Sequence, residues 1–149
     1  TGPRLLHFYP GSETRLLDMQ DGRVLALKVG DIVVHTFEAR ALVRRRNALW
    51  LYDAEAKEPA SSWTDLQVSV DEVADELHQG RYSWISPQWV DLKEGRVLGT
   101  QPRVLALSDD GRALVPVSPE ASAEELVSGP LMWVEAGDQV VPRGSGLEP

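Results

Sequence analysis

Histidines are the first side chains to weigh for chemistry in this chain, because imidazole serves both as a general base and as a metal ligand. The chain has three, His7, His35 and His78, and it has no cysteine. No two of them have the spacing that would bring them together on one helix face or across one hairpin, and thiolate ligands are absent. We therefore expect no metal site and no cofactor.

Each histidine also has a structural interpretation. His7 falls within an apolar stretch and is expected to be a hydrogen-bonded core or edge residue. His78 lies near the end of a predicted helix, where a partly charged imidazole would complement the helix dipole. His35 follows three apolar residues inside a strand that reads as buried, so its type alone suggests a core histidine.

Serine and aspartate offer no motif that predicts an enzyme by spacing alone. The chain has no Gly-x-Ser-x-Gly sequence, which marks the nucleophile of the lipase-type hydrolases. The acidic pair Asp109 and Asp110 precedes a glycine, a pattern typical of a turn.

One segment nevertheless resembles a known family. The ordered pieces are Arg81-Tyr-Ser-Trp-Ile-Ser-Pro87, Gly95-Arg-Val-Leu98 and Leu105-Ala-Leu-Ser-Asp-Asp110, with Trp63-Thr64 ahead of them. Together they resemble the central block of the Mu-like phage I proteins, which belong with the head maturation (prohead) serine proteases of tailed phages. The similarity covers about a third of the chain, residues 63–114.

The resemblance implies a serine endopeptidase with Ser86 as nucleophile and His35 as its base. His35 would accept the hydroxyl proton during attack on a peptide carbonyl and return it to the leaving amine. Asp109 or Asp110 would orient the imidazole, and backbone N–H groups would hold the oxyanion. The fold implied is similar to that of the herpesvirus assemblins.

Two departures from the family pattern keep a second function open. Val33 and Val34 precede His35, where the family carries acidic or aromatic residues, and Asp109-Asp-Gly111 replaces Asn-Asn-Pro. The alternative is a non-enzymatic capsid decoration or head-completion protein. Either role implies phage scaffold and major capsid protein as substrates or docking partners, and a location in the host cytoplasm or the virion. A decoration protein would also be a homo-oligomer.

Composition and charge indicate the general class of protein and the partners it is expected to avoid. The chain has 149 residues, 42% of them hydrophobic, and a formal net charge of −8. We expect a soluble single domain over residues 1–141 that binds neither nucleic acid nor membrane, since an acidic surface repels phosphate groups. Residues 142–149 are expected to be a flexible tail, because 141–145 resemble a thrombin-cleavable linker; the sequence leaves open whether the tail is native or vector-derived.

Short apolar runs between turn signals predict many strands. They are Arg4–Tyr9, Arg23–Lys28, Ile32–Phe37, Ala48–Tyr52, Leu66–Val70, Tyr82–Ile85, Trp89–Leu92, Arg96–Leu98, Arg103–Leu107, Ala113–Val117, Leu131–Glu135 and Asp138–Val141. Among the aromatic residues, Trp84 and Trp89 are expected in the core, or alternatively as an exposed pair forming a partner groove.

Three segments are predicted to be helical. Residues 38–46 should form a short helix ending in three arginines. Ser69 begins a capping-box pattern with an apolar stripe at Val70, Val73, Ala74 and Leu77, closed by Gly80. Ser118-Pro119 opens a third helix that stops at Gly129. The predicted fold class is α+β, a mostly antiparallel β-barrel or curled sheet with two or three outer helices.

Overall fold

The computed structural model describes residues 4–8, 13–58, 61–118 and 129–135. These residues form fourteen strands and no α-helix. The strands make four open antiparallel sheets, and in each sheet the neighbouring strands are also consecutive in sequence. The predicted α+β class is therefore wrong, because the described residues are nearly all β, and among them no barrel closes and no helix covers a sheet.

Each sheet is a meander, named here sheet 1 to sheet 4 in chain order. Sheet 1 contains β1 (Leu5–Phe8), β2 (Arg15–Asp18) and β3 (Val24–Ala26). Sheet 2 contains β4 (Asp31–Phe37), β5 (Arg40–Arg45), β6 (Ala48–Asp53) and β7 (Trp63–Ser69). Sheet 3 contains β8 (Glu76–Gln79), β9 (Tyr82–Ile85), β10 (Gln88–Asp91) and β11 (Arg96–Thr100). Sheet 4 contains β12 (Ala106–Leu107), β13 (Arg112–Pro116) and β14 (Leu131–Glu135).

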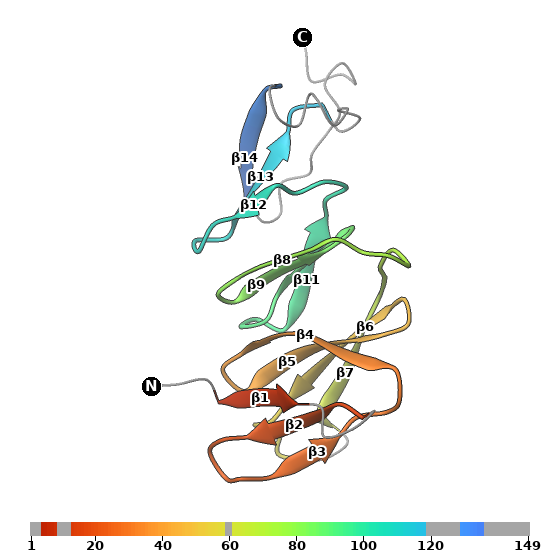
Figure 1. Cartoon of the computed structure of the whole chain (residues 1–149). Coiled ribbons are helices and arrows are strands. Elements are labelled where there is room, and N and C mark those ends of the chain that lie inside the picture. The colour runs from red at the N-terminus through yellow and green to blue at the C-terminus, as the bar shows by residue number, and fades with distance from the viewer. Residues whose placement is uncertain (1–3, 9–12, 59–60, 119–128, 136–149) are drawn as a thin grey trace.

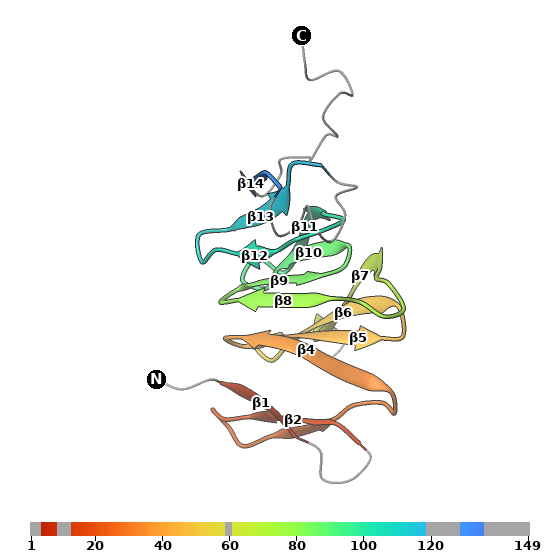
Figure 2. The same cartoon turned by 45° about the horizontal axis from the view of Figure 1, so that its top comes forward.

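The four sheets lie on one another in chain order. Sheet 1 is at one end of the stack and sheet 4 is at the opposite end (Figures 1 and 2). Three apolar clusters fill the spaces between them, one for each pair of adjacent sheets. Sheets 2 and 3 consequently pack on both faces, so residues pointing to either face are buried in β5, β9 and β10.

Strand alternation assigns each core residue to one space. In β5, Ala41 and Val43 pack toward sheet 1, whereas Leu42 packs toward sheet 3. In β9, Ile85 packs toward sheet 2, whereas Trp84 packs toward sheet 4. Successive side chains of a strand point to opposite faces of the sheet, so each central strand contributes to two cores.

The predicted helix at residues 38–46 is instead part of two hairpins. β5 pairs with β4 on one side and with β6 on the other. Glu38 and Arg46 stand in the tight turns and adopt left-handed backbone angles, with φ of 51° and 56°. Non-glycine residues seldom do so, which is why no turn signal appeared there. Arg44 lies in β5 rather than at a helix end, and its side chain donates to the carbonyls of Asp71 and Glu72.

The predicted helix from Ser69 to Gly80 is also wrong. Its apolar stripe divides among three environments: Val70 is buried against sheet 3, Leu77 packs toward sheet 4, and Val73 is 90% exposed. The segment ends β7, crosses to sheet 3 as a loop and forms β8. Tertiary hydrogen bonds replace helical ones there, since the Asp71 N–H donates to the Ser86 carbonyl.

Most of the predicted strands are confirmed, with boundaries that shift by a few residues. β2, β5 and β8 were not predicted as strands. The third predicted helix and the strand predicted at Asp138–Val141 lie outside the described residues, apart from the positions at the helix ends.

Candidate functional site

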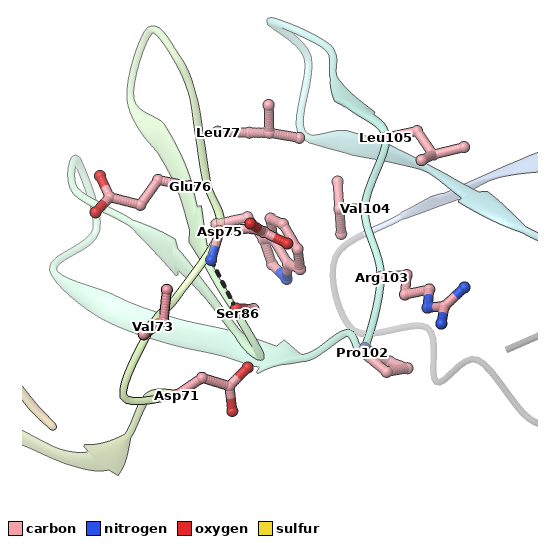
Figure 3. A pocket seen from close by; sticks show the side chains of 11 residues that line it. Asp71, Val73, Asp75, Glu76, Leu77, Ser86, Pro102, Arg103, Val104 and Leu105 are labelled. Atoms are coloured by element: carbon pink, nitrogen blue, oxygen red, sulfur yellow. Dashed lines mark hydrogen bonds between the residues drawn. The ribbon is translucent and has the colours of Figure 1, made fainter. Parts of the chain in front are cut away.

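Ser86 lines a pocket of about 510 Å³ between sheets 3 and 4. The residue directly follows β9 and is 5% exposed. Its Oγ accepts a hydrogen bond of 3.0 Å from the backbone N–H of Asp75 (Figure 3). The serine hydroxyl thereby fixes the loop that leads into β8.

The pocket is acidic on one side and mixed on the other. Asp71 and Asp75 line it together with Ser86, and Arg103 and Val104 lie across from them (Figure 3). The described lining contains no histidine. A carboxylate is a weaker base than an imidazole toward a serine hydroxyl, so the pocket itself supplies no strong activation of Ser86.

His35 lies in β4, on the sheet 2 side of sheet 3. Its Nε2–H donates to the Gly80 carbonyl at 2.7 Å. Its ring stacks on that of His78, with 4.7 Å between centroids and an interplanar angle of 13°. The imidazole predicted to be the base is thus hydrogen-bonded to, and stacked on, residues of the hairpin that β8 and β9 form.

Sheet 3 separates the predicted nucleophile from the predicted base. Ser83 and Ile85 point toward sheet 2, and it is on that face that His78 bonds Ser83 and stacks on His35. Trp84 points toward sheet 4, and Ser86 shares that face because it is two residues further along. The structure therefore does not bring Ser86 and His35 together.

The two aspartates suggested as a third catalytic group lie in the turn between β12 and β13. Asp109 is exposed, and Asp110 accepts hydrogen bonds from the hydroxyl of Ser108 and from Arg112 Nε. These two bonds lower the pKa of Asp110. Asp110 acts within its own turn, and the structure brings neither aspartate to His35, whose contacts are on the other side of sheet 3.

The structure instead assembles a serine, a histidine and a carboxylate that sequence reasoning missed. In the hairpin of β8 and β9, His78 stands directly opposite Ser83. Its Nδ1 lies 2.9 Å from the Ser83 hydroxyl, and its Nε2 lies 3.2 Å from Glu76 Oε1. An ionised carboxylate can only accept, so Nε2 carries the proton and Nδ1 accepts from Ser83.

These three residues have the connectivity of a catalytic triad but not its accessibility. Ser83 is fully buried, at 0% exposure, on the face of sheet 3 that packs against sheet 2. A peptide carbonyl would have to reach the hydroxyl through that core. Burial and the neighbouring His35 both lower the pKa of His78, with Glu76 opposing them, which keeps the imidazole neutral near pH 7. The group fastens the hairpin rather than exposing a nucleophile.

A signal for this group was present in the sequence. Leu77, His78 and Gln79 precede Gly80, and Tyr82, Ser83 and Trp84 follow after one more residue. Apolar and polar residues that mirror one another about a glycine indicate a hairpin. The capping-box pattern at Ser69 predicted a helix over the same residues, and for that reason the hairpin was not predicted.

Trp84 and Trp89 form the pair that could alternatively have been an exposed groove. They stand opposite each other in β9 and β10 and are 3% and 1% exposed. The indole N–H of Trp84 donates to the Gln101 carbonyl at 2.8 Å. Both belong to the core between sheets 3 and 4, so they form no partner groove.

No group of three or more histidines and carboxylates that could hold a metal ion occurs within the described residues. A search of the same residues finds no helix with the length and apolar character needed to cross a membrane. No family model, no curated protein and no solved structure matches this chain.

Proposed function

We propose that this chain is a non-catalytic docking protein. It corresponds to the second role that the phage resemblance suggests, capsid decoration or head completion, in place of proteolysis. The observation that carries the proposal is the position of Ser86 and His35 on opposite faces of sheet 3. A serine hydroxyl needs its base within hydrogen-bond reach, directly or through one water, and a sheet between the two side chains prevents this.

The occupied hydrogen bonds support the same conclusion. Ser86 holds the Asp75 backbone, and His35 holds the Gly80 carbonyl. To form a dyad, His35 would have to leave its stack on His78 and pass around the edge of sheet 3. Buried packing on both faces of this sheet opposes such a movement.

Fluorophosphonate labelling tests the absence of catalysis. The wild-type chain, Ser86→Ala and Ser83→Ala should all show only the background labelling of a heat-denatured sample, while an active serine protease in parallel is labelled. Strong labelling of the native wild type that disappears in Ser86→Ala would overturn the proposal and restore the peptidase.

Sedimentation tests the docking role directly. The purified chain should pellet with empty tailed-phage heads and stay in the supernatant without them. If it remains in the supernatant in both cases, docking on these heads is wrong, whatever the labelling shows.

A further inference from the structure

The two ends of the sheet stack both carry apolar side chains on their outward faces. In sheet 1, strand alternation turns Leu5 and Leu16 inward and leaves Leu6, Leu17 and Val24 side by side on the outer face. Leu6 is 39% exposed and Val24 is 51% exposed. We call this outer surface of sheet 1 the first end face; the neighbouring row of Phe8, Arg15 and Ala26 also belongs to it.

The outward face of sheet 4 has the same character. Ala106, Leu114 and Trp133 stand side by side across β12, β13 and β14. Trp133 is 45% exposed and Leu131, on the same face, is 40% exposed. We call this surface the second end face; Arg112 and Glu135 also stand on it, and the Arg112 guanidinium lies 5.4 Å from the centre of the Trp133 ring. The opposite side of sheet 4 holds Val115 and Val134 in the core shared with sheet 3.

We infer that a second copy of this chain stacks head to tail, with its first end face against the second end face of the first copy. Each of the three interfaces inside the chain joins two sheets that are consecutive in chain order. At each one, the face of a sheet that points toward the C-terminal end of the stack packs on the face of the next sheet that points toward the N-terminal end. Contact between the second and first end faces would repeat this same relation once more.

The physical reason is the one that holds the stack itself together. Repeat proteins are stable when neighbouring units cover each other's apolar faces, and their terminal units normally carry a polar outer surface. Both end faces instead carry an apolar row across all three strands, Leu6–Leu17–Val24 on the first and Ala106–Leu114–Trp133 on the second, and their charged residues stand in the neighbouring rows. Covering them with each other removes apolar area from water at both ends.

Head-to-tail contact also determines what assemblies form. A heterologous interface makes a ring if the rotation per copy closes and an open filament if it does not. β-Propellers are rings in which antiparallel meanders pack face to face in this way. An isologous dimer, in which two first end faces meet, would bring like faces together, a relation that occurs nowhere within the chain.

Light scattering coupled to size-exclusion chromatography tests the inference with one variant for each end face. The wild-type chain at about 100 µM, which reveals associations with a Kd of that order, should elute as an assembly of two or more copies. Val24→Glu alters the first end face and Trp133→Glu the second, and each alone should be a monomer. Val73→Glu is the matched control, since Val73 is 90% exposed and belongs to neither end face; it should assemble as the wild type does.

Mixing supplies the decisive result. Val24→Glu retains an intact second end face and Trp133→Glu retains an intact first end face, so the two monomers should form a one-to-one complex with a single joint. A monomeric wild type overturns the inference, as does a Trp133→Glu variant that still associates by itself, because that shows an isologous contact through sheet 1. Leu6→Glu and Leu131→Glu repeat the test if either variant has an altered circular dichroism spectrum. Fluorophosphonate labelling and sedimentation with phage heads test the proposed function, whereas the behaviour of the end-face variants and their mixture tests this inference.

Discussion

The two faces of sheet 3 carry different chemistry, although the same strands form both. The face toward sheet 2 holds His78, which stacks on His35 of β4, and a fully buried serine, Ser83. The face toward sheet 4 holds two buried tryptophans, the pocket and Ser86. Three residues along one strand are enough to move a serine from the histidine side to the pocket side, because alternation has a period of two. Proximity in sequence therefore says little about which side chains can react together.

The largest effect should come from the tryptophan face. Trp84→Ala removes a side chain that is 3% exposed and also the indole bond to the Gln101 carbonyl. We expect a loss of about 3–5 kcal/mol in the free energy of unfolding, measured by urea denaturation. Trp84→Phe keeps an aromatic ring there and should lose less than Trp84→Ala. Equal losses for the two would mean that the ring contributes little to this core.

The same face should also respond to a single added methyl group. Gly111 has a φ of 90°, and a Cβ built there would lie 2.7 Å from the Tyr82 hydroxyl oxygen. Gly111→Ala should cost about 2–3 kcal/mol, of which left-handed backbone strain accounts for about 1–2 kcal/mol. Gly22→Ala is the matched control: its φ is 75° and its Cβ would meet nothing within 4 Å. Denaturant melts should show the larger loss for Gly111→Ala, and the reverse order would contradict the close packing of Tyr82.

The two serines allow a direct comparison of the faces. Ser83→Ala leaves Nδ1 of the half-buried His78 without its donor and should cost about 1–3 kcal/mol. Ser86→Ala frees the Asp75 N–H beside an open pocket, where water can replace the hydroxyl, so we expect about 0.5–1.5 kcal/mol. Urea melts of both variants measure the difference. A larger loss for Ser86→Ala would show that its face is the drier one.

The smallest expected effect is a pH dependence from the imidazole face. The folded-state pKa of His78 is lowered by burial first and then by His35, against the opposing influence of Glu76. The unfolded chain therefore binds the proton more readily, so the stabilising contribution is complete above the ordinary histidine pKa of about 6.5 and declines as pH falls below it. Thermal melts between pH 8 and pH 5, in phosphate and acetate buffers, should show this decline.

The matched variant for that measurement is His78→Gln, which keeps a polar side chain but cannot titrate. Its melting temperature should fall less than that of the wild type over the same pH interval. Asp18, whose pKa is lowered chiefly by its hydrogen bond to Arg4, loses its contribution only as pH falls below the ordinary carboxyl value, so it does not interfere above pH 5. If the melting temperatures of the wild type and of His78→Gln change equally with pH, His78 is not the cause of the pH dependence.

Turn chemistry explains which hairpins could be predicted. Asp109-Asp-Gly111 predicted the turn between β12 and β13, and Gly30 predicted the turn before β4. The turns on either side of β5 use Glu38 and Arg46, which have no such signal, and β5 was predicted to be a helix. Each sheet repeats one meander topology with different residues, so comparing segments of the sequence did not reveal the repetition.

The sequence by itself determined the strand-rich character and the absence of cysteine chemistry, because apolar runs, residue types and glycine turns are local properties. Only the tertiary structure decided how the meanders stack and which face each side chain occupies. Capping-box residues became a strand and a loop because bonds from Arg44 and Ser86 replaced helical ones. The distance between two reactive groups depends on which sheets meet, and no spacing along a chain encodes that.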